Sequence, residues 1–199
     1  MNVKQPSAAL AAVLVLGLGV FEPASAQSAG SFYAGASLGQ SQYRNTCEFI
    51  DGSCDDKDTA FRVFGGYNVS PGLAIEAAYG DFGRILVDGS VGGVPTNFEA
   101  TVEALDLSVL PAWVLSERFA IFGRFGIYRS KVQVSDLGGG GGSESERNTA
   151  WTYGLGVRWS FGGGPVSLRA EWQRYDNIGG SSTGEDDIDY INAGVVLQF

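Results

Sequence analysis

Single charged residues recur within segments of alternating hydrophobicity, where they could form ion pairs or take part in acid–base chemistry. Each lies on the face opposite the bulky apolar residues, as Glu76 does between Ile75 and Ala77 and Arg124 does beside Phe125. Alternation with a period of two residues is typical of a β-strand with one apolar face. The sequence therefore predicts a set of charges on the less apolar face of a sheet: Glu76, Arg124, Arg158, Arg169 and Glu171.

Acidic residues also gather in two polar segments, where they could bind a divalent cation or act as catalytic acids. The first segment contains Asp51, Asp55, Asp56 and Asp58, and the second is the run 185–189. Such oxygen ligands suit calcium or magnesium, but neither segment has the spacing of a known calcium loop. The chain contains no histidine, which excludes histidine-dependent catalysis. We therefore expect no enzyme, metal ion or cofactor and interpret these acids as solvated charge.

The first 26 residues have the pattern of an export signal. Lys4 lies in a short polar start, an apolar run follows from residue 8 to 21, and the small residues 24–26 form a cleavage site. A transmembrane helix is the competing interpretation, but this run is shorter than the roughly 20 residues needed to cross a bilayer. The mature chain is expected to begin at Gln27, and residues 27–199 have the size of one domain.

The two cysteines, Cys47 and Cys54, are expected to become oxidised, because an exported chain enters an oxidising compartment. They lie close together in an acidic segment that contains glycine and serine. A small loop disulfide is therefore expected, with two free thiols as the alternative.

Eight segments with period-two alternation predict an all-β fold, an eight-stranded antiparallel up-and-down transmembrane barrel. Short turns rich in proline or glycine are expected at 70–72, 111–118 and 162–165. The predicted strands are 32–43, 60–69, 73–82, 101–109, 119–134, 151–161, 166–175 and 188–199.

Longer polar stretches alternate with these turns, and they predict loops on the opposite end of the barrel. They span residues 45–58, 83–97, 135–148 and 176–187, and the glycine run 138–142 is interpreted as a mobile loop tip. Short turns at one end and long loops at the other are typical of outer-membrane barrels.

The composition of the two strand faces decides which one meets lipid. Along 151–161, aromatic and aliphatic residues alternate with Gly154, Gly156 and Arg158. A soluble barrel of lipocalin type would direct its apolar face inward and its charges outward. Here glycines and isolated charges suit a narrow lumen, so the bulky face is expected to meet lipid. Aromatic residues near strand ends fit interfacial girdles: Tyr67, Tyr79, Trp113, Trp159 and Phe161.

The C-terminal strand ends with an aromatic residue and places Val195, Leu197 and Phe199 on one face. This pattern resembles the signal that the barrel-assembly machinery of the outer membrane reads. A chance terminal aromatic is the alternative, but it accounts for neither the export signal nor the eight strands.

Three regions, 32–43, 64–69 and 171–173 with 177–179, together resemble the OmpA-like transmembrane domain family. The resemblance extends over essentially the whole mature chain. It implies an outer-membrane barrel whose lumen is blocked by paired charges, and a rearrangement of those pairs would gate a small conductance. Full-length members also carry a periplasmic peptidoglycan-binding domain, which is not expected in a chain that ends at residue 199.

The resemblance matches Glu76 and Arg169 to one acid–base pair of the lumen. The second pair departs from the family pattern, because Arg158 stands where an acid is expected and Leu110 stands about where its base would be. A purely structural lumen, in which the charges only neutralise one another, is the alternative to gating. Asp106 or Glu171 could supply the missing acid, so the predicted lumen network is Glu76, Asp106, Arg124, Arg158, Arg169 and Glu171.

The sequence thus predicts a barrel of the outer membrane with a structural role or a small gated pore. Surface recognition through the four long loops is the alternative. The expected partners are outer-membrane lipid, lipopolysaccharide and, during biogenesis, the barrel-assembly machinery, with the chain itself a monomer. A net charge of −9 excludes a nucleic-acid partner.

Overall fold

The computed structural model describes residues 29–44, 51–91, 94–136, 143–162, 164–180 and 184–199. Within these ranges the side chains at 51–54, 86–91, 94–97, 136, 143–144, 180 and 184–185 are not described. The predicted signal peptide, the glycine run 138–142 and the side chains of Cys47 and Cys54 lie outside the described part of the chain. The signal peptide, the mobile tip and the disulfide therefore remain predictions. None of the described residues forms a helix long and apolar enough to cross a membrane.

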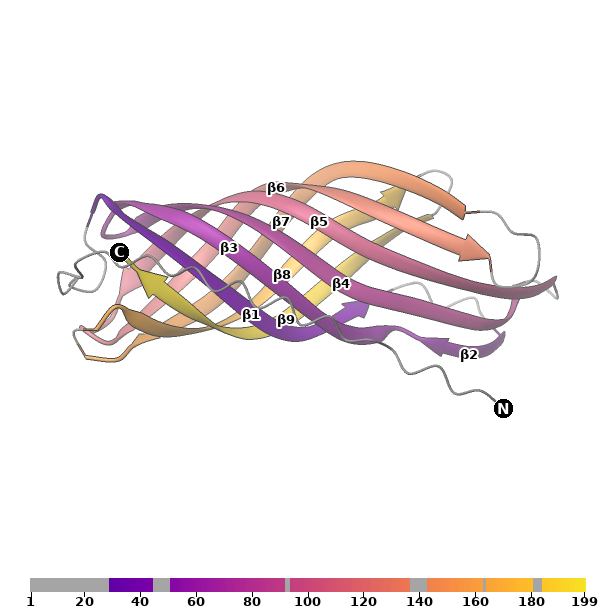
Figure 1. Cartoon of the computed structure of the whole chain (residues 1–199), viewed down its shortest axis with the longest axis horizontal. Helices are drawn as coiled ribbons and strands as arrows, with labels where there is room; N and C mark the ends of the chain where they lie inside the picture. The colour runs from indigo at the N-terminus through magenta and orange to yellow at the C-terminus, as the bar shows by residue number, and fades with distance from the viewer. Residues whose placement is uncertain (1–28, 45–50, 92–93, 137–142, 163, 181–183) are drawn as a thin grey trace.

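Eight antiparallel strands close into a barrel, as the sequence predicts (Figure 1). β1 pairs with both β3 and β9, and the pairing of β4 with β5 completes the ring. Closure gives every strand a neighbour on both sides, which a bilayer requires because lipid tails offer the backbone no hydrogen-bond partners. The strands are β1 (Ser31–Tyr43), β3 (Lys57–Ser70), β4 (Leu73–Val91), β5 (Val94–Val114), β6 (Phe119–Asp136), β7 (Ser143–Ser160), β8 (Val166–Gly180) and β9 (Gly184–Gln198).

The bulky apolar residues face outward, which confirms the orientation predicted from the sequence. Phe125 is 66% exposed and Trp151 is 68% exposed, although both residues are strongly apolar. On the turn side, Trp159 and Phe161 stack with their ring centroids 5.7 Å apart, as expected for an interfacial girdle. The outward face becomes polar toward the loops, beginning with Asp81, Glu103, Arg129, Arg174 and Asp189.

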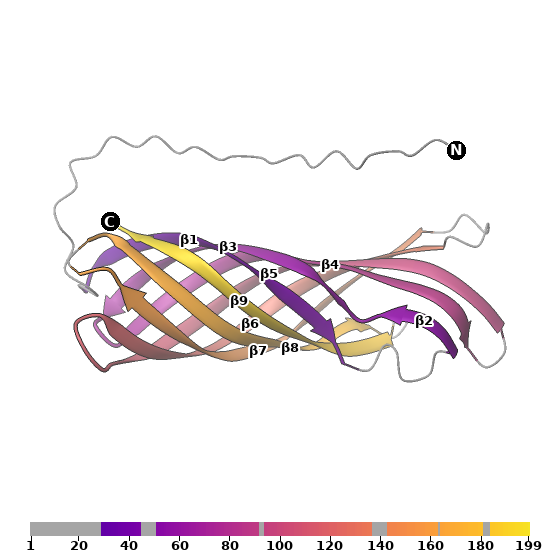
Figure 2. The ribbon, with the colours of Figure 1, turned by 90° about the horizontal axis from the view of Figure 1, so that it is seen from below.

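The predicted long loops are wrong in extent. The strands continue well beyond the outward-facing apolar residues just described, which we call the apolar belt. β4 and β5 occupy nearly all of 83–97, β6 and β7 include both ends of 135–148, and β8 and β9 include most of 176–187. In the predicted loop 45–58, a short additional strand, β2 (Asp51–Asp55), pairs with the distal part of β4. Figure 2 shows these extensions at the end of the barrel opposite the C-terminus.

Two β-bulges explain why the strands predicted from the alternating pattern end earlier than the observed strands. The registers shift between Asp81 and Arg84 on β4 and between Tyr175 and Ile178 on β8. Each bulge places two residues opposite one, so the inward and outward positions exchange parity beyond it. The first bulge has Gly83 at φ 75° and is held by Asp58 Oδ2, which accepts a hydrogen bond of 2.8 Å from the Arg84 amide.

An apolar cluster fills the lumen where the strands extend, and we call it the loop-side core. Phe82 lies at its centre, with ring centroids 4.7 Å from Tyr175 and 5.5 Å from Tyr190. Tyr128 packs on Tyr175 at 5.1 Å. This inward burial stabilises strands whose outward faces are polar. The loop-side core comprises Tyr43, Ala60, Phe82, Ile85, Ala100, Val102, Ala104, Tyr128, Val132, Tyr175, Ile178, Ile188 and Tyr190.

A second cluster fills the other end of the lumen, and we call it the turn-side cluster. Its aromatic rings lie over inward-facing glycines: Tyr33 is paired with Gly66 across β1 and β3, and Phe122 with Gly156 across β6 and β7. A Cβ on Gly66 would lie 2.3 Å from Tyr33 Cζ. The glycines therefore provide the space that these rings occupy. The turn-side cluster comprises Tyr33, Phe64, Ala74, Ala78, Leu110, Phe122 and Val196.

A methyl group at Gly66 is expected to destabilise the barrel, whereas one at the adjacent Gly65 is not. Gly66→Ala displaces the Tyr33 ring, and overpacking of this kind costs about 1–3 kcal/mol. Gly65 faces outward, and its added Cβ would lie 3.7 Å from the nearest atom, Tyr33 O. Gly65→Ala should therefore stay within about 0.5 kcal/mol of the wild type. Urea unfolding in lipid vesicles, followed by tryptophan fluorescence, measures both, and equal stabilities would contradict the packing described.

Candidate functional site: a charge layer in the lumen

Six buried charged side chains form a layer across the lumen, between the loop-side core and the turn-side cluster. The order is visible along β6, where Tyr128 belongs to the loop-side core, Arg124 to the layer and Phe122 to the turn-side cluster. Strand alternation directs each charge inward. We call this set the charge layer: Arg62 on β3, Glu76 on β4, Asp106 on β5, Arg124 on β6, and Arg169 and Glu171 on β8.

Glu76 is the centre of the charge layer, because its carboxylate contacts all three arginines. Arg169 Nη1 lies 2.7 Å from Oε2, and Arg124 Nη2 lies 2.6 Å from Oε1. Arg62 Nη2 approaches the same Oε1 at 3.1 Å. The Tyr33 hydroxyl donates a further hydrogen bond of 2.9 Å to Oε2. Both carboxylate oxygens are thus fully engaged without water.

The other two carboxylates complete the pairing. Asp106 accepts hydrogen bonds from Arg62 Nη2 at 3.0 Å and from Nε at 3.3 Å, and it also accepts one from the Tyr175 hydroxyl at 3.0 Å. Glu171 binds Arg169 Nη2 at 2.6 Å and forms a short hydrogen bond with Arg124 Nε. Each guanidinium therefore contacts two carboxylates or more, which is the arrangement that makes buried charge tolerable.

The charge layer is electrically balanced and closed to solvent. Its three guanidinium groups match three carboxylates, and no member is more than 5% exposed. Arg169 also lies between two aromatic rings, with its Cζ 4.7 Å from the Phe64 centroid and 4.5 Å from that of Phe122. These rings stabilise the cation on its turn side. A buried layer of paired charges can hold the barrel together and block ions.

The structure brings five of the six predicted lumen residues together and leaves Arg158 outside the layer. Arg158 lies nearer the turns, with its Cζ 5.8 Å from the centroid of the Tyr33 ring, and its register partner is Arg169. Leu110 is buried in the turn-side cluster. The two candidates for the missing acid, Asp106 and Glu171, both enter the layer, although neither has Arg158 among the ion pairs that the structure records.

Arg62 is the member that the sequence analysis missed. The signal was present, because Phe61 and Val63 are bulky apolar residues on either side of Arg62, as expected for an inward charge on a lipid-facing strand. Both neighbours do face outward, with exposures of 40% and 46%. The hydroxyl partners Tyr33 and Tyr175 could not be found in this way, since their roles depend on strands that are distant in sequence.

The loop acids do not form a metal site among the residues that the structure describes. No group of three or more His, Cys, Asp or Glu side chains there is arranged to hold an ion. Asp58 instead caps the β4 bulge, and Asp189 accepts two hydrogen bonds of 2.8 Å from Arg174. The side chains of Asp51 and Glu185 lie outside the described set.

Removing one charge from the layer should destabilise the protein more than removing a balanced pair. Arg124→Met leaves the acids in excess, and breaking a buried pair in this way costs about 3–5 kcal/mol. Arg124→Met combined with Glu171→Met restores neutrality, so the double variant should recover part of that loss. Urea unfolding in vesicles measures each variant, with Arg118→Met on the turn side as the exposed control. A double variant less stable than Arg124→Met would show that neutrality is not what stabilises the layer.

Comparison with known proteins agrees with this architecture. The profile of the OmpA-like transmembrane domain matches residues 27–199. Outer membrane protein A of Escherichia fergusonii is 29% identical over 161 residues, which are 77% of this chain and 43% of that protein. The chain thus spans less than half the length of that relative.

Two solved barrels share the fold at low sequence identity. Neisserial surface protein A superimposes with a TM-score of 0.63 at 18% identity, covering 84% of this chain and 97% of that one. Ail of Yersinia pestis, crystallised with the heparin analogue sucrose octasulfate, has a TM-score of 0.56 at 16% identity and covers 86% and 100%. These likenesses concern the fold alone. The chain belongs to the OmpA-like transmembrane domain family and is an integral β-barrel protein of the cell outer membrane.

Proposed function

We propose that this protein is a closed structural barrel of the outer membrane, whose charge layer holds the wall together and blocks ion flow at rest. The observation that carries this proposal is the solvent-free balance of three arginines with three carboxylates. The layer links β3, β4, β5, β6 and β8, so it joins opposite sides of the wall. Apolar clusters on both sides of the layer support the same conclusion.

A small gated pore would require these ion pairs to exchange partners. Arg124 and Arg169 each contact both Glu76 and Glu171, so alternative pairings exist within the layer. An exchange alone opens no path, however, because the loop-side core also fills the lumen, with Phe82 and Tyr175 both fully buried. The charge layer and the loop-side core therefore block the lumen independently. For this reason we favour the structural role over the gated pore.

Surface recognition is a second candidate function, and the extended strands favour it. The loop-side core gives the strands beyond the apolar belt an interior of their own, which makes them a stiff platform for the connecting segments. Binding residues are commonly carried on loops that a rigid scaffold positions. Ail, a barrel of the same fold, was crystallised with a sulfated sugar analogue. This function would lie on the outside of the cell and leave the lumen closed.

The remaining features of the proposal follow from the sequence. We propose a monomer without enzymatic activity, cofactor or nucleic-acid partner, which contacts lipid and lipopolysaccharide. The residues that the barrel-assembly machinery would read are Val195 and Leu197 on β9 and Phe199 directly after it, and all three are exposed. A cleaved signal at 1–26 and a disulfide between Cys47 and Cys54 complete it.

The folded protein should be electrically silent in planar bilayers. Single-channel recording of the wild type, Glu76→Gln and Arg169→Met should show no discrete steps, because the loop-side core remains closed when the charge layer is perturbed. Heat-modifiable gel migration checks that each variant is folded. Steps in the wild type that change in amplitude or frequency in either variant would establish a gated pore instead and reject the closed barrel.

A further inference from the structure

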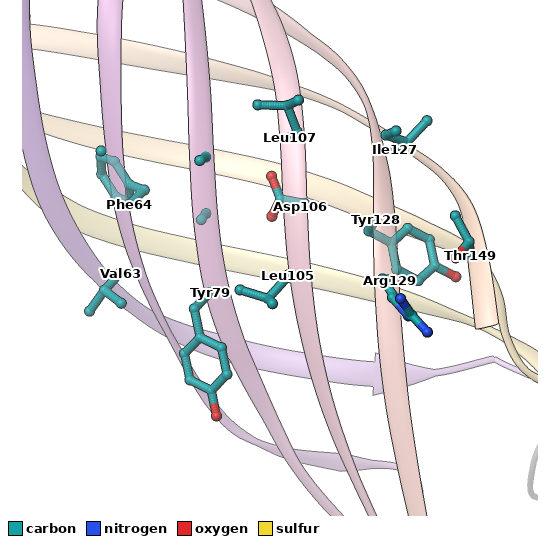
Figure 3. A pocket seen from close by; sticks show the side chains of 13 residues that line it. Val63, Phe64, Tyr79, Leu105, Asp106, Leu107, Ile127, Tyr128, Arg129 and Thr149 are labelled. Atoms are coloured by element: carbon teal, nitrogen blue, oxygen red, sulfur yellow. The ribbon is translucent and has the colours of Figure 1, made fainter. Parts of the chain in front are cut away.

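The lipid-facing surface has a hollow across β3, β4, β5 and β6 (Figure 3). Gly65 and Ala77 are register partners and form its floor, because neither carries a side chain beyond Cβ. Larger outward residues, among them Val63, Tyr79, Leu105 and Ile127, stand around this floor. The hollow has a volume of about 640 Å³, and its loop end is bordered by Arg129 and Thr149. We call it the outer groove.

Three cations lie at and just beyond the loop end of the outer groove, where Arg129 borders it, and we call them the cation cluster: Arg129, Lys131 and Arg147. Arg129 and Lys131 are alternate residues on the outward face of β6, and Arg147 is the register partner of Lys131 on β7. Like charges directly opposite each other on neighbouring strands destabilise a sheet. The arrangement therefore favours an anion that would lie among the three side chains.

No carboxylate of the described residues forms an ion pair with any member of the cation cluster. The acid nearest by register is Glu103, which faces Lys131 across β5 and β6. Arg174, the outward arginine on β8, differs because Asp189 holds it with two hydrogen bonds of 2.8 Å. The cation cluster is therefore a positive patch on a chain whose net charge is −9.

The outer groove and the cation cluster meet in one continuous surface. Leu105 on β5 is paired with Arg129 on β6, so the apolar wall and the first cation are side by side. Lys131 lies one outward position further along, about 6.6 Å at the rise of a β-strand. The long loops of such barrels face the outside, so this surface belongs to the outer leaflet. The surface is apolar on its membrane side and cationic on its loop side. It therefore matches an acyl chain joined to a phosphorylated headgroup.

We propose that the outer groove and the cation cluster bind one molecule of lipopolysaccharide, with an acyl chain over Gly65 and Ala77 and a phosphate on Arg129, Lys131 and Arg147. This inference deepens the proposed function, since it names the site for the lipopolysaccharide contact suggested there. It does not depend on whether the lumen conducts. All of the residues involved face outward, so a failed binding experiment and a conducting barrel are separate results.

Titration of the refolded full chain in detergent micelles with fluorescent lipopolysaccharide tests the site. Removal of Arg129 and Arg147 as Arg129→Gln with Arg147→Gln should weaken binding about fivefold for each charge. Ala77→Trp fills the floor of the outer groove and should weaken binding similarly. The matched controls are Arg118→Gln at the turns and Ala170→Trp on the lipid-facing side of β8, and neither should change affinity.

Competition identifies which part of the ligand is recognised. Unlabelled lipopolysaccharide should displace the probe, whereas its dephosphorylated form, phosphatidylglycerol and inorganic phosphate should compete at least tenfold less well. Equal competition by phosphatidylglycerol would reduce the site to a general contact with anionic lipid and overturn the proposal. Displacement by inorganic phosphate alone, or unchanged affinity in either the cation variant or Ala77→Trp, would overturn it as well. Heat-modifiable migration confirms that each variant is folded.

Discussion

The pairing of buried charges inside a nearly dry lumen is the constraint on which this barrel depends. Every second residue of each strand points into a space that water does not enter at the level of Glu76 and Arg124. An unpaired ion there would be very costly, so the three cations and three anions of the charge layer contact one another directly, while a fourth buried arginine, Arg158, lies nearer the turns. Four members lie on the consecutive strands β3 to β6, and Arg169 and Glu171 reach them from β8 on the other side of the lumen. The contacts of Arg169 with Glu76 and of Arg124 with Glu171 therefore stabilise β8 against the opposite wall.

The width of the lumen is the second constraint, and it explains the composition of the inward face. Eight strands enclose little more than the side chains themselves. Large rings such as Tyr33 and Phe122 are accommodated only where a glycine faces them on the neighbouring strand. The rings then support the charge layer, since Tyr33 donates to Glu76 and Phe122 lies on Arg169. The inward glycines therefore make room for the aromatic rings, and the rings in turn contact the ion pairs of the charge layer.

Beyond the belt of outward-facing apolar residues, the alternation continues with the polar and apolar faces reversed. There the outward face meets water, and the inward face carries the loop-side core around Phe82. The bulges at Asp81 and Tyr175 keep apolar residues pointing inward on both sides of the parity change. The barrel is consequently polar outside and apolar inside at this end, which reverses its arrangement within the membrane. The outer groove and the cation cluster lie where the two arrangements meet.

The sequence by itself determined the strand count, the lipid-facing side and most of the buried charges, because each of these depends on local alternation with a period of two. Glu76, Arg124, Arg169 and Glu171 could be directed inward without knowing any neighbour, and Arg62 could have been found by the same rule. Tertiary structure alone decided which charges meet, why Arg158 stands apart and how far the strands extend. Partners such as Arg62 and Asp106 are 44 residues apart, and only the register of β3 and β5 on the two sides of β4 brings them together. Beyond a bulge the inward and outward positions of a strand are exchanged. The alternation of apolar and polar residues is therefore interrupted at the bulge, although the strand and its hydrogen bonds continue.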